Sequence, residues 1–302
     1  MIPTSHFFPA LLTFHLFPLH APITLFGLDA PFGRFSDQNS RLNINGNLAW
    51  SLMELVSPIT FITTLFKNNH PPLNLSSHIL AGLYLFHYAH RAIISPLVLS
   101  PKRSPLHLAV PLAAMIFNFL NGYLLALGLA FYPVKEPGWT FYLCIVGWAI
   151  GFFGNVYHDE ILNDLRRPRD RRLILADLPE DKDTDAGRYK IPRGCLFKFV
   201  SFPNYLCEWL EWAAWSLAAN PCPFIALPPF SSLLLTTGPT HTFLSILSQI
   251  YWPKNLLAPS WTFVLAEVAS MLPRAIRGHE WYKKKFGDKY PKERKAVIPG
   301  IL

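Results

Sequence analysis

The chain has 302 residues, of which 51% are hydrophobic, 15% are aromatic and only 15% are charged, and its formal net charge is +8. This composition does not suit a soluble globular protein and favours a membrane protein, with many Trp, Phe and Tyr rings available for the membrane–water interface. The four cysteines form no CxxC pair and have no histidines at zinc spacing, so neither a metal site nor a disulfide framework is predicted.

Seven stretches contain the roughly 20 mostly apolar residues that a membrane-spanning helix requires. They are residues 6–28, 48–66, 76–100, 106–132, 139–157, 196–219 and 256–274. The first lacks the basic region of a cleaved secretory signal and is expected to be retained. Prolines such as Pro58 and Pro96 predict kinks or helix ends within the spans. We therefore predict an all-α membrane protein, a seven-transmembrane helix bundle forming a single polytopic domain.

The orientation follows from Lys and Arg, which are retained in cytoplasmic connections. With a lumenal N-terminus, the cytosolic segments are residues 29–47, 101–105, 158–195 and the tail from 274, and together they hold 22 basic residues. The lumenal connections hold only three lysines. The N-terminus is therefore predicted to be lumenal and the C-terminus cytosolic.

Residues 220–255 are apolar enough to suggest an eighth span, but they contain six prolines. An eighth span would also place the basic tail on the lumenal side. We interpret this segment as an insertion that is either lumenal or re-entrant.

Polar residues at membrane depth usually face a cavity or a partner and indicate a functional site. Glu54 lies in the middle of the second predicted span, where it serves a functional site or joins helices by hydrogen bonds. In the third span, His87, Tyr88 and Arg91 crowd into five positions, with His87 and Arg91 on one face of a regular helix. If Arg91 lay at the membrane interface, its side chain would extend to the headgroups. That position would account for Arg91 but not for the other polar residues beside it.

Two more polar sets occur where spans meet the cytosolic segments. Asn155, Asp159 and Arg166 have helical spacing and are predicted to share one face. This face either binds ribose hydroxyls and phosphates or is a solvated helix end. Asn204, with the two carboxyl groups that follow it, shares a face of the sixth span. Two carboxyl groups in one span are costly unless they are paired.

The tail after the last span has nine basic and three acidic residues with interleaved aromatic rings, which suits an anionic cofactor or anionic lipid. A nucleic-acid partner is not expected beside seven spans. Neither GxGxxG nor GxxxxGK[ST] occurs, so any nucleotide site is not of the Rossmann type. The small residues Gly147, Gly151 and Gly154 lie within a span, where they favour helix packing.

Taken together, these segments resemble the steroid 5α-reductase family of polytopic membrane reductases, in the family's order and over nearly the whole chain. The matching strings are APFGRFS, AWSLMELVSP, HYAHRAIISPLVLSP, NGYL, GFFGNVYHDEILNDLRRP, YKIPRGCLFKFVSFPNYLCEWLEWAAWSLA and RAIRGHEWYKKKFGDKYPKERKAVIPGIL. The resemblance implies a bundle in the endoplasmic reticulum membrane that binds NADPH from the cytosolic side. It also implies reduction of a carbon–carbon double bond conjugated to a ketone, most simply that of a 3-oxo-Δ4-steroid.

By the same resemblance, Glu54 and Tyr88 would hydrogen-bond the carbonyl of a lipophilic enone, with Arg91 and Glu211 close to the substrate. A further set falls on positions that the family uses around its cofactor: Asn121, Asn155, Asp159, Arg166, Tyr189, Asn204, Glu208, Arg274, His279, Tyr282 and Arg294. Residues 1–150 would then supply the substrate-side spans, and residues 151–302 the cofactor-binding region.

Three departures from the family pattern leave alternatives open. Gly278 stands where the family commonly has a first His before His279, so one polar contact is expected to be missing. The insertion at 220–255 has no counterpart in the steroid enzymes, and the PNY string at 203–205 is also similar to enoyl-CoA reductases. A trans-2-enoyl thioester or a polyprenol is therefore an alternative substrate. A non-catalytic lipid binder or transporter is a further reading, although no internal repeat supports a transporter.

Overall fold

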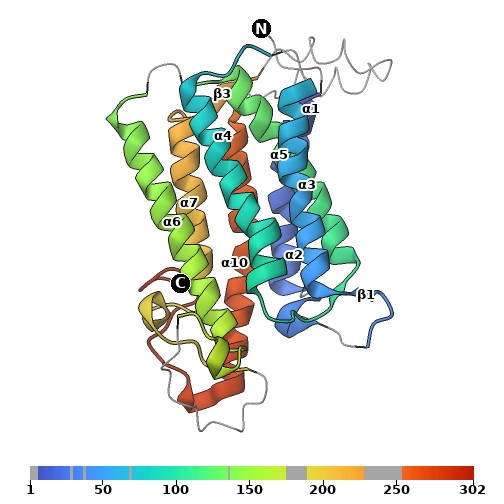
Figure 1. Cartoon of the computed structure of the whole chain (residues 1–302), viewed down its shortest axis with the longest axis vertical. Helices are drawn as coiled ribbons and strands as arrows, with labels where there is room; N and C mark the ends of the chain where they lie inside the picture. The colour runs from blue at the N-terminus through green and yellow to red at the C-terminus, as the bar shows by residue number, and fades with distance from the viewer. Residues whose placement is uncertain are drawn as a thin grey trace.

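A computed structural model of the chain describes residues 6–27, 30–36, 39–67, 70–134, 137–174, 189–227 and 254–302. The long helices run side by side along the longest axis of the molecule (Figure 1). Their bounds are α1 Phe7–Leu16, α2 Ala21–Phe26, α3 Gly46–Lys67, α4 Leu75–Tyr88, α5 Ala109–Phe131, α6 Trp139–Asp164, α7 Pro203–Ala219 and α10 Pro259–Phe286. A π-helix, η3 Ala89–Leu99, continues α4. The helical class is thus confirmed.

Each predicted span coincides with a helical segment, but only four segments in the described part of the chain are long and apolar enough to cross a membrane. These are Phe7–Phe26, Gly46–Lys67, Ala109–Phe131 and Trp139–Asp164. The other three segments, α4 with η3, α7 and α10, fall outside this group, and α7 has only 17 residues, two of them glutamates. The number of seven spans and the orientation of the termini therefore stay predictions.

The predicted sixth span begins too early at residue 196. A 3₁₀ turn, η6 Cys195–Lys198, occupies its first residues, and the α7 helix begins only at Pro203. Gly194, just before η6, has φ +96°, and Cys195, the first residue of η6, has φ +42°, values that a regular α-helix does not allow. Pro203 then starts α7 at the first helical position, where its missing N–H is not needed.

Two short antiparallel pairs of strands connect the helices. Strand β1 (Asn43–Ile44) pairs with β2 (Leu106–His107), and β3 (Phe224–Ala226) pairs with β4 (Asn255–Leu257). The second pair brings together the two ends of the insertion predicted at 220–255. Residues 228–253 lie outside the described part of the chain, so the choice between a lumenal and a re-entrant insertion stays open.

The core between the helices is rich in aromatic side chains. Trp212, Trp215, Tyr84 and Phe263 are among its largest fully buried residues. Tyr84 packs against Trp212 with ring centroids 5.9 Å apart, and Trp212 contacts Phe263 edge-on at 4.9 Å. These rings join α4, α7 and α10 in the middle of the bundle, directly beside the polar residues described below.

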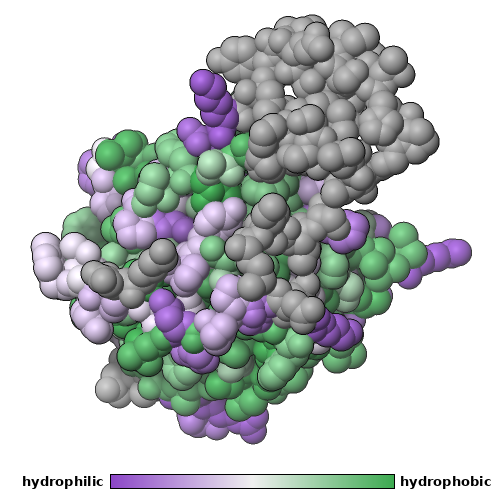
Figure 2. Space-filling view, turned by 90° about the horizontal axis from the view of Figure 1, so that it is seen from above, coloured by the Kyte–Doolittle hydropathy of each residue, from purple (hydrophilic) through white to green (hydrophobic). Residues whose placement is uncertain are grey.

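Several connections between helices and the segment after α10 gather at one end of the bundle (Figure 1). This end, called here the basic end, consists of residues 30–36, 100–107, 165–174, 189–202 and 287–302. The start of α1 lies at the opposite end. The outside of the bundle carries large hydrophobic areas (Figure 2), with residues such as Leu143, Ile150 and Phe153 of α6 more than half exposed. An apolar flank of this extent suits contact with lipid.

Candidate active site

The polar centre of the bundle is organised around Arg91. Its Nε lies 3.4 Å from an oxygen of Glu54 on α3, and its terminal nitrogen lies 3.5 Å from Glu208 on α7. The guanidinium also lies 5.2 Å from the centre of the Trp50 ring. Glu54 and Glu208 are 8% and 2% exposed. One cation therefore joins two buried carboxyl groups that are 154 positions apart in the chain.

A chain of hydrogen bonds extends from Glu208 toward the end of α6. Asn155 donates to Glu208 and to the backbone carbonyl of Asn204, both at 3.0 Å. Asn204 in turn donates to Asp159 at 2.9 Å, while its own carbonyl oxygen Oδ1 is buried and has no partner among the described residues. Four residues that the sequence places around a cofactor are thus connected, and they present one unused acceptor.

Tyr88 belongs to a second network in the same region. Asn121 donates from one amide nitrogen to the Tyr88 hydroxyl at 2.9 Å and to Ser57 at 3.2 Å. Ser57 is 2.5 Å from the hydroxyl of Tyr84. The Tyr88 hydroxyl accepts a hydrogen bond from Asn121, and Ser57 and Tyr84 are also within hydrogen-bonding reach of it. The structure links Asn121 to Tyr88, on the substrate side of the predicted site.

Glu211 is fully buried and lies with His87, the two side chains 2.7 Å apart. The His87 ring contacts Trp212, with centroids 4.6 Å apart. His87 and Arg91 both reach glutamates of α7, Glu211 and Glu208, so both side chains lie toward α7. The α-helix ends at Tyr88 and a π-helix follows, whose wider turns change the spacing of side chains beyond this point.

The helix α3 is also perturbed at the site. Pro58 lies one turn after Glu54 and cannot donate the backbone hydrogen bond that the carbonyl of Glu54 would accept in a regular helix. The π-helix contains Pro96. Both helices that carry the proposed carbonyl-binding residues are therefore irregular, as is common where helices form functional sites.

At the end of α6 the structure corrects a second expectation. The helix ends at Asp164, before Pro168, so Arg166 lies beyond the face that carries Asn155. The Asp164 carboxylate accepts hydrogen bonds from the backbone of Leu173 and Ile174, which fixes the turn. The neighbouring Arg167 makes local ion pairs, to Glu160 at 2.8 Å and to Asp164 at 2.6 Å.

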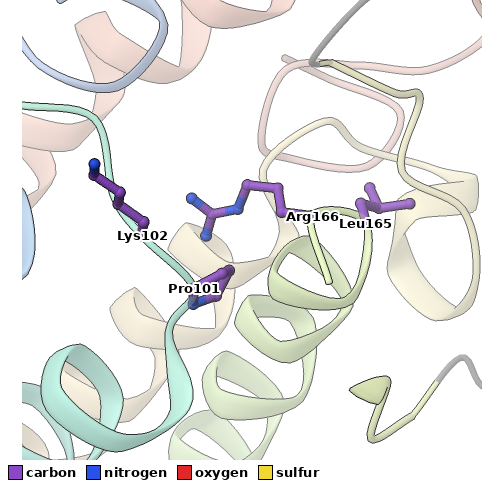
Figure 3. A pocket seen from close by; sticks show the side chains of 4 residues that line it. All are labelled: Pro101, Lys102, Leu165 and Arg166. Atoms are coloured by element: carbon purple, nitrogen blue, oxygen red, sulfur yellow. The ribbon is translucent and has the colours of Figure 1, made fainter. Parts of the chain in front are cut away.

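Arg166 donates to Asn163 at 2.7 Å and lines a hollow of about 340 Å³ with Pro101, Lys102 and Leu165. Its guanidinium points toward the segment of Pro101 and Lys102 (Figure 3). Two basic side chains from distant parts of the chain thus border one hollow at the basic end. Such a site suits an anionic group.

The remaining predicted residues lie around the end of α10. Arg274 donates to the carbonyl of Phe32 at 3.1 Å and lies 3.4 Å from the centre of the Phe32 ring. The guanidinium of Arg34 lies 4.4 Å from the centre of the Tyr282 ring. Tyr189 contacts Trp281, with ring centroids 4.9 Å apart. Residues 30–36 are therefore held against α10 by two reciprocal cation–π contacts.

The absence of a side chain at Gly278 has a structural reason. A Cβ at this position would lie 2.3 Å from Cζ of Phe202, so the ring of Phe202 occupies the space of a side chain. Arg34 donates to the Gly278 carbonyl at 3.3 Å. The side chain that the family commonly carries here is replaced by contacts of the backbone and of a neighbouring ring.

His279 lies beyond the predicted span 256–274 and contacts Ser201, with Nδ1 and the hydroxyl oxygen 2.6 Å apart. Ser201 is also 2.6 Å from the hydroxyl of Tyr290. Burial, with the nearby positive charge of Lys283 and Arg294, lowers the pKa of His279 to about 4. His279 is therefore neutral at physiological pH and serves as a hydrogen-bonding group.

Sequence reasoning missed Glu267 on α10. This carboxyl group interacts electrostatically with Arg91, Glu208 and Glu54, and no hydrogen-bond or ion-pair partner for it occurs in the described ranges. It is the only acidic residue within the predicted span 256–274. The rule that an ionisable group at membrane depth indicates a site would have selected it.

The arrangement is that of a helical membrane protein with a buried acid–arginine centre and a basic face at one end. The family profile described as 3-oxo-5-alpha-steroid 4-dehydrogenase matches residues 103–245 and 243–302. The chain is 31% identical over 274 residues to a steroid 5-alpha-reductase of Solanum lycopersicum, covering 88% of this chain and 84% of the relative.

A 3-oxo-5-alpha-steroid 4-dehydrogenase 1 of Mus musculus is 28% identical over 276 residues, with 90% and 87% covered. An uncharacterized protein of Schizosaccharomyces pombe is 37% identical over 281 residues, with 86% and 85% covered. The chain belongs to the 3-oxo-5-alpha-steroid 4-dehydrogenase family. It is an oxidoreductase acting on CH–CH groups, and the family resemblance found in the sequence is confirmed.

Proposed function

We propose that the protein reduces the C=C bond of a 3-oxo-Δ4-steroid to the 5α-reduced 3-oxosteroid in the endoplasmic reticulum membrane, using NADPH. The observation that carries this proposal is the position of Arg91, which joins Glu54 on the substrate side to Glu208 on the cofactor side. A substrate carbonyl near Glu54 and a cofactor near Glu208 would then meet at one centre. The relatives named as steroid reductases supply the substrate class.

The residues present fit a nicotinamide dinucleotide phosphate. The unused acceptor on buried Asn204 suits a donor such as an amide or a ribose hydroxyl. The hollow of Arg166 and Lys102 suits a phosphate. Residues 151–302 contribute most of these groups. When bound, NADPH supplies the hydride, and the protein supplies position and electrostatic stabilisation.

On the substrate side, Tyr88 and Glu54 act on the carbonyl oxygen. Asn121 holds the Tyr88 hydroxyl in place, and this hydroxyl donates its proton to the carbonyl when the substrate binds. Glu54 donates in its protonated form, and the set of Glu54, Arg91 and Glu208 is electrically neutral when one of its two carboxyl groups holds a proton. Both donors draw electron density toward the oxygen, so the β carbon accepts hydride and the α carbon of the resulting enolate takes a proton. Fixed donors aimed at a developing oxyanion are the strongest stabilisation available to such a reaction.

The test uses purified protein in detergent with NADPH and a 3-oxo-Δ4-steroid. We expect consumption of NADPH and a product heavier by two hydrogens.

Glu54→Gln and Tyr88→Phe are each expected to lower kcat by about 10²–10³. Glu280→Gln is the matched control, because Glu280 is exposed on the outer part of α10. Unchanged turnover in Glu54→Gln would remove Glu54 from the mechanism. Product formation from an enoyl-CoA or a polyprenol instead of the steroid would assign a different substrate, and NADPH that does not bind would refute the reductase proposal.

A further inference from the structure

A second hollow at the basic end lies apart from the one that Arg166 lines. It has a volume of about 320 Å³ and is lined by Arg193, Gly194, Lys198, Pro291 and Arg294. Its walls come from the turn before α7 and from the segment after α10. The lining contains three basic residues and no acidic one.

Arg294 is the buried member of this lining, with only 3% of its surface exposed. Its guanidinium donates to the Tyr290 hydroxyl at 3.5 Å and lies 5.1 Å from the centre of that ring. Its Nε is buried and has no hydrogen-bond partner in the described structure. A buried guanidinium that lacks a carboxylate leaves donors and charge uncompensated, which favours an anion beside it.

Arg193 and Lys198 are exposed at the mouth of the hollow. Neither has an ion pair within the described segments, and the carboxylates that neutralise Arg91 and Arg167 elsewhere have no equivalent here. The three positive charges therefore add at one point on the surface. Their combined potential concentrates anions from solution.

The backbone fixes the two walls relative to each other. Ser201 donates to the carbonyl of Lys295 at 2.9 Å, and the N–H of Lys295 donates to the carbonyl of Phe199 at 2.9 Å. A parallel bridge between Val200 and Lys295 joins the same segments. The hollow is thus formed before any ligand arrives, which lowers the entropic cost of binding.

A phosphomonoester is the anion that best matches this site. It carries about −1.5 to −2 charge at neutral pH and three acceptor oxygens, and a guanidinium binds two of them in a planar fork. The hollow is also connected to the predicted cofactor residues, because the Tyr290 hydroxyl that Arg294 contacts is joined through Ser201 to His279. NADPH contains one such group, at the 2′ position of its adenosine ribose, and NADH does not.

We propose that the hollow of Arg193, Lys198 and Arg294 is a phosphomonoester site that holds the 2′-phosphate of NADPH and makes the protein select NADPH over NADH. This assignment rests on the proposed function. It names Arg193 and Lys198 as specificity-determining residues, neither of which sequence reasoning selected.

The test measures the dissociation constants of NADPH and NADH with the full-length protein in detergent, followed by tryptophan fluorescence. The variant Arg193→Ala/Lys198→Ala removes the two exposed cations and leaves buried Arg294 in place. Lys284→Ala/Lys285→Ala is the matched control, since both lysines are exposed at the end of α10 and lie outside the hollow. We expect the first variant to bind NADPH about 10- to 100-fold more weakly, with NADH binding unchanged, and the control to resemble wild type.

Competition identifies the source of the phosphate. Inorganic phosphate should displace NADPH from wild type more effectively than it displaces NADH, and this difference should vanish in Arg193→Ala/Lys198→Ala. An equal loss of NADPH and NADH affinity, or no loss of either, would overturn the assignment while leaving NADPH binding intact. If the two residues instead govern binding to vesicles containing phosphatidic acid and not to NADPH, the ligand is a lipid headgroup and the proposal is wrong. If the wild-type protein binds neither NADPH nor NADH, the proposed function and this phosphate-site assignment both fail.

Discussion

The close packing of α6 against α7 should be essential for the site, and Gly151→Ala tests this directly. A Cβ at Gly151 would lie 2.4 Å from the backbone nitrogen of Glu211, 2.6 Å from its Cα and 2.7 Å from the carbonyl oxygen of Cys207. All three atoms belong to backbone, which cannot rotate away. Since non-bonded contacts are comfortable at about 3.5 Å, the two helices would have to separate by roughly 1 Å.

That separation also acts on Asn155, which lies one turn further along α6. Its 3.0 Å hydrogen bond to Glu208 would lengthen to about 4 Å, beyond hydrogen-bonding distance. Overpacking costs about 1–3 kcal/mol, and a lost hydrogen bond to a charged group costs about 1.5–3 kcal/mol. We therefore expect a fall in Tm on the order of 10 °C and weaker NADPH binding.

The measurement is thermal unfolding in detergent followed by tryptophan fluorescence, with an NADPH titration of each variant. Gly82→Ala is the matched control, because a Cβ at Gly82 of α4 would meet nothing within 4 Å. Replacing a mid-helix glycine by alanine there should raise stability by about 0.5–1 kcal/mol. A Gly151→Ala protein that melts at or above the wild-type temperature would refute the reasoning.

Three further outcomes follow from individual contacts. Arg91→Met leaves two buried carboxyl groups without their cation and should destabilise the protein by about 3–5 kcal/mol in thermal unfolding at neutral pH; an unchanged Tm would contradict the ion-pair account. Arg34→Ala removes a guanidinium that lies 4.4 Å from Tyr282 and should lower Tm, and Arg34→Lys should not restore it, because an ammonium lacks the planar face that stacks. Burial lowers the pKa of His279 to about 4 from its ordinary 6.5, so the unfolded chain binds the proton more readily and stability should fall as the pH drops from 6.5 toward 4. The pH slope of Tm in this window should be shallower in His279→Gln, and equal slopes would show that another group is responsible.

The positions of the helices were accessible from the sequence because apolar length is a strong local signal. The predicted stretch 48–66 corresponds to α3 at Gly46–Lys67, and 106–132 corresponds to α5 at Ala109–Phe131. The start of α7 was not accessible, because it depends on the positive φ angles at Gly194 and Cys195. Gly194 is visible in the sequence, but nothing marks Cys195 as a residue with this backbone conformation.

The individual polar residues of the site were predictable from the sequence, but the contacts between them were not. Polarity at membrane depth selects Glu54, Arg91 and Glu208 one at a time. The ion pairs among them require α3, η3 and α7 to meet, and no local pattern in the sequence indicates that meeting. The link of Asn121 to Tyr88 likewise depends on the packing of α5 against α4.

The roles assigned to the site residues and to NADPH are tested most directly by following the hydride itself. The measurement is mass spectrometry with fragment analysis of the product formed from a 3-oxo-Δ4-steroid and NADPH that carries deuterium at the transferred position. The account predicts a 5α-reduced product with deuterium at the carbon β to the ketone and a hydrogen from solvent at the α carbon, formed far more slowly by Glu54→Gln. A product with deuterium at any other carbon, or equal product formation by wild type and Glu54→Gln, would contradict it.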